Sequence, residues 1–277
     1  MAGTLYVVAT PLGNLGDLTG RAAEVLRQVA VVAAEDTRRS QGLLSHLGAH
    51  PRLISFHAHS PDKRIATLLE RLEGGDDVAL VSDAGTPGVS DPGAELVAAA
   101  RDAGVRVVPI PGVSAVTAAL SASGLPADRY LFLGFLPRKG SERRRLLAQA
   151  AAAECTVVLY ESPLRLAALL EDLAQAAGGA RKAVVARELT KMFEEFRTGT
   201  LEDLVQVYGG EPPRGEITLL LEGAERGAEE PGEALDLVAE AARLLAEGET
   251  RKDAVRFLVE RLGVPRNEAY RIVTALP

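Results

Sequence analysis

The sequence lacks tryptophan and has one cysteine, Cys155, among 277 residues. A single cysteine cannot form a disulfide within the chain, which excludes a small disulfide-stabilised scaffold. No apolar run approaches the ~20 residues that a membrane-spanning helix needs. The first residues also lack the basic and apolar segments of a signal peptide. We therefore expect a cytoplasmic protein with no membrane partner.

Several common catalytic motifs are missing as well. The first apolar run is not followed by G-x-G-x-x-G, and neither a phosphate-binding G-x-x-x-x-G-K-S/T loop nor a G-x-S-x-G turn occurs. Only four histidines accompany the cysteine. His57 and His59 would share one face of a strand, but the sequence offers no third ligand. We therefore expect no metal site.

The charge balance also limits the possible functions. Lys and Arg total 31 against 38 Asp and Glu, which gives a net charge of -7. A chain of this sign binds nucleic acid only if its basic residues gather locally. The hydrophobic fraction of 47% is normal for a globular protein, and the length predicts about two domains.

Short apolar runs alternate with helical spacing along most of the chain. Strands are expected at residues 5–9, 31–34, 78–81 and 105–110. Continuous apolar strands separated by helices are typical of a parallel sheet covered on both faces. A second α/β domain is expected from further strands at residues 130–136, 156–160, 183–186 and 216–221.

The C-terminal part has helical patterns only. An acidic stretch rich in Gly and Ala, residues 223–232, predicts a linker. Three helices are expected after it, at residues 234–247, 250–262 and 266–276. The second has Thr250 followed by Asp253, a typical helix start. The last two resemble a helix-turn-helix. The expected domains are residues 1–111, 112–225 and 232–277.

Turns rich in Gly and Pro follow several of the predicted strands. They lie at residues 10–14, 35–37, 83–92 and 111–115. Ligands of open parallel sheets bind at the carboxyl ends of the strands. Glycine lets the backbone approach a ligand closely, and proline fixes the loop beforehand. These turns therefore predict a binding site for a small ligand such as one with an adenine or a carboxylate.

The same segments carry a resemblance to a known family. Residues 10–19, 34–38, 82–93 and 109–115 resemble the tetrapyrrole methylase family, and within it the members that act on small-subunit ribosomal RNA. Residues 133–140, 160–163 and 186–191 extend the resemblance over essentially the whole chain. It implies two unequal α/β domains with S-adenosylmethionine in the cleft between them, and a homodimer.

The implied reaction is methylation of the ribose 2′-hydroxyl of a cytidine in the decoding region of 16S rRNA, within the small ribosomal subunit. Two alternatives stay open. One is a tetrapyrrole C-methyltransferase of the same fold. The other is a non-catalytic RNA-binding factor for ribosome assembly.

The resemblance also implies donor-binding positions. They are Pro11, Asp83, Ala84, Gly85, Thr86, Val89, Ser114, Ala115, Glu161 and Gly199. In relatives that methylate tetrapyrroles, a Gly-Gly-Asp-Pro turn holds the donor. Here the turn is Ala84-Gly85-Thr86-Pro87, so Thr replaces Asp, and Asp83 is the residue that compensates.

A ribose hydroxyl is a poor nucleophile, so a base or a positive neighbour should help to remove its proton. Glu35, Glu188 and Lys191 follow predicted strands and are the candidate catalytic residues. Their alternative role is a surface ion pair between neighbours.

The RNA-binding candidates are Arg38, Arg138, Lys139, Arg143, Arg144, Lys252, Arg256 and Arg266. Such clusters would neutralise phosphates, and the alternative is a solvated helix face. Phe135 and Tyr270 are the best-placed aromatic side chains for base stacking. Recognition is expected to depend mainly on shape and phosphates.

Overall fold

The structure is a computed structural model that describes residues 2–57, 62–225, 237–246, 249–262, 264 and 266–276. The chain divides into two compact units, Met1–Ala224 and Glu225–Pro277. Of the helices in the described ranges, none is long and apolar enough to cross a membrane.

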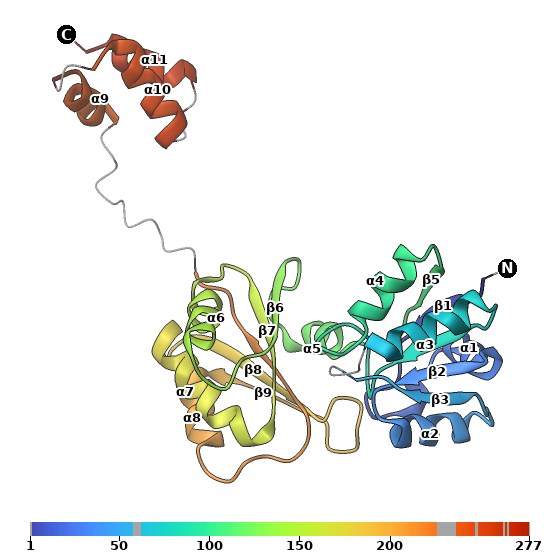
Figure 1. Cartoon of the computed structure of the whole chain (residues 1–277). Coiled ribbons are helices and arrows are strands. Elements are labelled where there is room, and N and C mark those ends of the chain that lie inside the picture. The colour runs from blue at the N-terminus through green and yellow to red at the C-terminus, as the bar shows by residue number, and fades with distance from the viewer. Residues whose placement is uncertain are drawn as a thin grey trace. The chain divides into compact units, whose positions relative to one another are not determined.

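The first lobe of the larger unit is built on a parallel sheet with the strand order β3-β2-β4-β1-β5. The strands are β1 (Thr4–Val8), β2 (Val31–Ala34), β3 (Arg52–Ser55), β4 (Val78–Val81) and β5 (Arg106–Ile110). The helices are the short η1 (Leu15–Asp17), α1 (Gly20–Gln28), α2 (Thr37–His46), α3 (Asp62–Glu73) and α4 (Ala94–Asp102). Figure 1 shows them around the sheet.

Both faces of this sheet are buried. Along β2, Val31 and Ala33 pack with α3 and α4, whereas Val32 and Ala34 pack with α1 and α2. A strand buried on both faces must be apolar at every position, which is why β2 and β4 are continuous apolar runs. The predicted parallel sheet is confirmed.

The second lobe has a mixed sheet with the strand order β6-β7-β10-β8-β9. Its strands are β6 (Tyr130–Phe135), β7 (Thr156–Glu161), β8 (Lys182–Arg187), β9 (Glu195–Thr200) and β10 (Ile217–Leu221). Only β6 and β7 pair in parallel. The helices are α5 (Ala115–Ser123), α6 (Ser141–Ala152), the short η2 (Pro163–Arg165), α7 (Leu166–Ala177) and α8 (Leu201–Tyr208).

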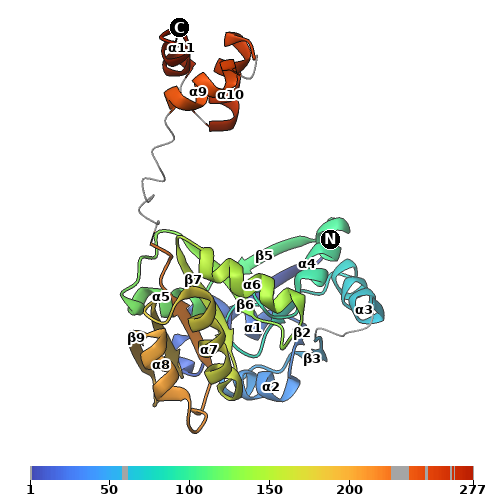
Figure 2. The same cartoon turned by 90° about the vertical axis from the view of Figure 1, so that its left-hand side faces the viewer.

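Alternate residues of the second sheet face two different layers. Leu159, Val185 and Leu219 pack against α6, α7 and α8, which lie side by side in Figure 2. On the opposite face, Val158 and Leu220 pack against α5. Phe132 and Tyr160 lie on the α5 face too, and Tyr160 helps to form the cavity described below.

The smaller unit contains α9 (Leu237–Ala246), α10 (Arg251–Leu262) and α11 (Arg266–Thr274). They share a small apolar core that includes Leu258 and Val273. The predicted helix start at Thr250 is confirmed, because the Asp253 amide donates to the Thr250 hydroxyl at 3.2 Å. His59, most of the predicted linker and parts of the predicted 263–265 turn lie outside the described residues.

Candidate functional site

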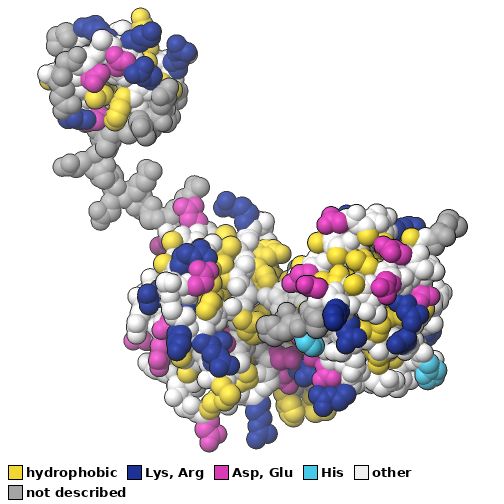
Figure 3. Space-filling model, viewed as in Figure 1, with side chains coloured by type: hydrophobic (Ala, Val, Ile, Leu, Met, Phe, Trp, Pro, Cys, Tyr) yellow, Lys and Arg dark blue, Asp and Glu magenta, His cyan; other side chains and the backbone are white. Residues whose placement is uncertain are grey.

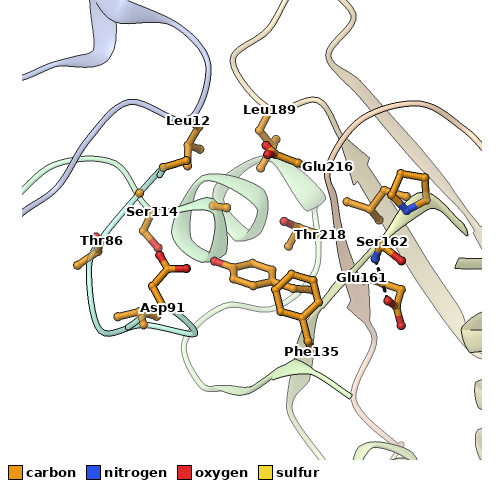
Figure 4. A pocket seen from close by; sticks show the side chains of 17 residues that line it. Leu12, Thr86, Asp91, Ser114, Phe135, Glu161, Ser162, Leu189, Glu216 and Thr218 are labelled. Atoms are coloured by element: carbon orange, nitrogen blue, oxygen red, sulfur yellow. Dashed lines mark hydrogen bonds between the residues drawn. The ribbon is translucent and has the colours of Figure 1, made fainter. Parts of the chain in front are cut away.

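A cavity of about 300 Å³ lies where loops of the two lobes meet. The first lobe contributes the loops after β1, β4 and β5, and the second contributes α5, β6, β7, β10 and the loop after β8. Three of the four predicted strand-end turns therefore line it. The turn after β2 does not. Figure 4 shows the side chains that surround the cavity.

Gly85 fixes the loop after β4 against the loop after β1. Its amide donates to the Thr10 carbonyl at 2.9 Å, and its carbonyl accepts from the Thr10 amide at 2.8 Å. Gly85 has φ of 78°, a conformation that favours glycine. The Thr86 hydroxyl donates to the Val113 carbonyl at 3.2 Å. These bonds join the three turns into one preformed wall.

The same loop continues to the second lobe. Ser90 has φ of 60°, which is uncommon for a residue with a side chain. A Cβ atom on Gly134 would lie 2.4 Å from the Ser90 hydroxyl oxygen. Gly134 also has φ of 62°, so a side chain there would be strained and would displace Ser90; it lies at the irregular step of β6 after Phe132.

An aromatic group forms much of the opposite wall. The Tyr160 ring lies 5.0 Å from the Phe132 ring and 5.5 Å from the Phe135 ring, between centroids. The backbone of Val116, in the first turn of α5, lies near the Tyr160 hydroxyl and lowers its pKa slightly. Burial, together with the charge of Asp91, raises the pKa of Tyr160 to about 12. Phe135 remains 56% exposed.

Three carboxylates line the cavity, on Asp91, Glu161 and Glu216. Burial raises the pKa of Asp91 to about 6, the nearby charges of Glu35 and Asp83 add to this rise, and a Ser82 hydrogen bond opposes it. Asp91 lies within the Gly- and Pro-rich 83–92 turn, but no sequence pattern distinguishes it from its neighbours there. Its proximity to Tyr160, on a distant strand, is visible only in the fold.

Glu161 is almost fully buried. Its Oε1 atom accepts from the Ser162 amide at 2.8 Å. Its Oε2 atom lies 3.2 Å from the Arg165 guanidinium but receives no hydrogen bond from any described group. Arg165 instead donates to the Leu136 carbonyl at 2.7 Å. This carboxylate is therefore held by Ser162 and Arg165 and is buried within the wall of the cavity.

Most of the predicted donor-binding residues line this cavity. They are Ala84, Gly85, Thr86, Val89, Ser114, Ala115 and Glu161. Pro11 and Asp83 instead line a neighbouring recess of about 290 Å³. Asp83 accepts from the Asp36 amide at 2.9 Å and forms an ion pair with Arg39 at 3.5 Å. Gly199 lies in β9, paired with Ala183, and does not line the cavity.

None of the three catalytic candidates lines the cavity. Lys191 Nζ donates to Glu188 Oε1 at 2.8 Å and to Glu216 Oε2 at 3.1 Å, and only Glu216 of these three lines the cavity. The hydrogen bond from Lys191 lowers the pKa of Glu188. Burial raises the pKa of Glu35, and the charge of Asp83 adds to the rise.

The RNA-binding candidates have differing surroundings. Arg143 is only 12% exposed, because its guanidinium pairs with Asp172 and donates to the Pro137 carbonyl. Arg38 and Arg256 are exposed but pair with nearby aspartates. The remaining candidates, Arg138, Lys139, Arg144, Lys252 and Arg266, are exposed. On the face shown in Figure 3, basic and acidic side chains of the described residues are interspersed.

Fold and site together define a class of protein: a two-lobed α/β enzyme whose preformed loops hold a small ligand at the carboxyl ends of a parallel sheet. The family model described as Tetrapyrrole (Corrin/Porphyrin) Methylases matches residues 4–205. The chain therefore belongs to the tetrapyrrole methylase family, as the resemblance predicts, and it is a methyltransferase.

Individual proteins give a finer comparison. The chain is 46% identical to the ribosomal RNA small subunit methyltransferase I of Synechocystis sp. over 98% of this chain and 97% of that protein. It is also 46% identical to the protein of that name from Pseudomonas aeruginosa, over 98% and 96%. The structure resembles that of uroporphyrin-III C-methyl transferase from Thermus thermophilus complexed with S-adenosyl homocysteine. The TM-score is 0.58 and the identity 20%, and the match covers 79% of this chain and 97% of that one.

Proposed function

We propose that this chain is an S-adenosylmethionine-dependent methyltransferase that methylates the ribose 2′-hydroxyl of a cytidine in the decoding region of 16S rRNA. The observation that carries the proposal is the 46% identity, over almost the full length of both chains, to enzymes named for small-subunit ribosomal RNA. The substrate is the rRNA within the small ribosomal subunit, and the reaction takes place in the cytoplasm.

The cavity fits the methyl donor. S-adenosylmethionine supplies a methyl group on a positively charged sulfur, and it also has an ammonium group and an adenosine. The volume of about 300 Å³ lies at the lower end of the range for small-molecule sites. The lining combines apolar side chains, among them Leu12, Val89 and Phe135, with the hydroxyls of Thr86 and Ser114, which suits an adenosine.

Loops of the first lobe would hold much of the donor. The backbone of Ala84 and Gly85, the hydroxyls of Thr86 and Ser114, and the side chain of Val89 provide a preformed surface. Preformed contacts reduce the ordering cost of binding. Asp83 supports this surface indirectly, because its hydrogen bond and ion pair hold the end of β4 against the turn after β2.

The surface beside the cavity suits an RNA strand. Phe135 lines the cavity and remains largely exposed, so its ring can stack on a base. Arg138 and Lys139 are exposed and follow Phe135 closely along the chain, where they can neutralise phosphates. The exposed Met192 and Phe193, at 90% and 69%, are apolar side chains suited to a homodimer contact.

A transfer assay tests the function. The protein is incubated with methyl-labelled S-adenosylmethionine and, in separate reactions, small ribosomal subunits, naked 16S rRNA and uroporphyrinogen III. We expect label in the 16S rRNA of the subunits. Label in the macrocycle alone would support a tetrapyrrole C-methyltransferase, and label in none of the three would support a non-catalytic factor. Sedimentation of the protein alone tests the homodimer.

A further inference from the structure

The three carboxylates that line the cavity differ in their partners. Glu161 forms an ion pair with Arg165, and Glu216 accepts from Lys191. Asp91 forms no ion pair with any Lys or Arg of the described residues, and the Ser82 side chain nearby lowers its pKa only in part. We propose that Asp91 is the general base that accepts the proton of the ribose 2′-hydroxyl during methyl transfer. This inference rests on the proposed function.

The loop holds Asp91 in a defined position. The backbone pair of Gly85 with Thr10 fixes its start. Next to Asp91, Ser90 contacts Gly134 of the second lobe. In Figure 4 the Asp91 carboxylate points into the cavity, beside Ser114. A base fixed at both ends of its loop keeps its orientation, and positioning of this kind is a large part of the effect of a catalytic group.

The surrounding charges favour a base that works near neutral pH. Burial is the main cause that raises the pKa of Asp91 to about 6. Glu35 at the end of β2 and Asp83 at the end of β4 add negative charge, and Asp83 is itself paired with Arg39. On the second lobe, the group that faces Asp91 is the Tyr160 phenol. A carboxylate with a pKa near 6 is deprotonated at pH 7 and is a stronger base than an ordinary one.

The step balances in atoms and charge. A lone pair of the 2′-oxygen forms the new O–CH₃ bond while the S–CH₃ bond breaks, and the electron pair of the broken bond stays on sulfur. The 2′-hydroxyl proton passes to the Asp91 carboxylate and afterwards to water. The products are S-adenosylhomocysteine, the 2′-O-methyl nucleotide and one proton.

The other ionisable groups suit this role less well. Lys191 is a cation held by two carboxylates, so it has no lone pair with which to accept a proton. Glu188 has a lowered pKa and is therefore a weaker base. Glu35 does not line the cavity. Its negative charge raises the pKa of Asp91, which makes Glu35 a positioning residue for that carboxyl.

The test compares Asp91→Asn with Asp102→Asn, an equally small change at the exposed end of α4. Three quantities are measured for each variant and for the unmodified enzyme: the melting temperature, the S-adenosylmethionine Kd by calorimetry, and the pH dependence of kcat and kcat/KM for 16S rRNA in small subunits. We expect Asp91→Asn to lower kcat by about 100-fold or more, with donor affinity close to that of the unmodified enzyme. Asp102→Asn should change none of the three.

The pH profile identifies the titrating group. The kcat/KM of the unmodified enzyme should rise with pH through about 6 and then level off, and Asp91→Asn should lack this rise. Glu35→Gln removes a neighbouring negative charge, so it should move the rise to lower pH. A rise that Glu35→Gln does not move would contradict its assignment to Asp91.

Other outcomes overturn the inference in distinguishable ways. An Asp91→Asn enzyme with normal kcat shows that Asp91 is not the base. Loss of donor binding with normal kcat at saturating donor shows that Asp91 holds the donor instead. If the unmodified enzyme transfers no methyl group to rRNA, the proposed function fails and the inference fails with it.

Discussion

Replacing Gly85 with alanine tests the preformed wall of the donor cavity. An alanine at φ of 78° has the strain of the left-handed conformation, about 1–2 kcal/mol. The new Cβ atom itself fits, with its nearest neighbours at 3.4 Å on Leu12 and 3.9 Å on the Val113 carbonyl. The variant therefore folds, and its cost comes from the backbone rather than from a clash.

The same strain should weaken donor binding. If the free variant relaxes the turn, the Gly85–Thr10 hydrogen bonds are lost, and binding must restore them. The donor then binds less tightly by up to the strain energy, which corresponds to about 5–30-fold in Kd. Calorimetry with S-adenosylmethionine measures this change, and thermal denaturation should show a fall in Tm of a few degrees.

Gly104→Ala is the matched control. Gly104 has φ of 70°, in the turn before β5, and a Cβ atom there would meet no heavy atom within 4 Å. Its strain is therefore similar, but it lies away from the cavity. We expect a similar fall in Tm with unchanged donor affinity. Equal donor affinity in both variants would refute the claim that the Gly85 turn forms the donor site.

Further predictions concern the charged residues and the smaller unit. Arg143→Ala should lower Tm, because it breaks hydrogen bonds to a carboxylate worth about 2 kcal/mol, and leave the affinity for rRNA unchanged. Arg138→Ala should leave Tm unchanged and weaken rRNA binding. It should also reduce the salt dependence of that binding, because one phosphate contact is lost. Deleting residues 225–277 should weaken rRNA binding at moderate salt and leave donor affinity unchanged in calorimetry. The contact with Lys191 lowers the pKa of Glu188 below its ordinary value of 4.5. The contact therefore stabilises the fold above pH 4.5, and this stabilisation is lost as the pH falls through the lowered pKa of Glu188 in the folded protein. The Tm of the Lys191→Met variant should therefore fall less than that of the unmodified protein as the pH is lowered from 4.5.

The buried strands could be predicted from the sequence because their chemistry is local. A strand covered on both faces needs an apolar residue at each position, and residues 78–81 show this pattern directly. The edge strand β9 was not predicted, because it has polar and charged residues and is largely exposed or half-buried. The antiparallel pairing of β10 with β7 and β8 also depends on contacts distant in sequence.

The site likewise has features that follow from local sequence and features that depend on contacts distant in sequence. The turns that line the cavity stood out by their Gly and Pro content. The setting of Asp91 did not, because its burial and its proximity to Tyr160 arise only when the two lobes meet. Arg143 is a residue whose local sequence points to a different partner from the one it has in the fold. Within a basic segment it resembles a phosphate ligand, but Asp172, on a different helix, engages it.

Analysis of the methylated nucleoside tests the central claim most directly. Small ribosomal subunits are incubated with the protein and methyl-labelled S-adenosylmethionine, and the 16S rRNA is digested to nucleosides and separated by mass. The account predicts that the label is found in 2′-O-methylcytidine. Label in a base-methylated nucleoside, or no label in the rRNA, would contradict it.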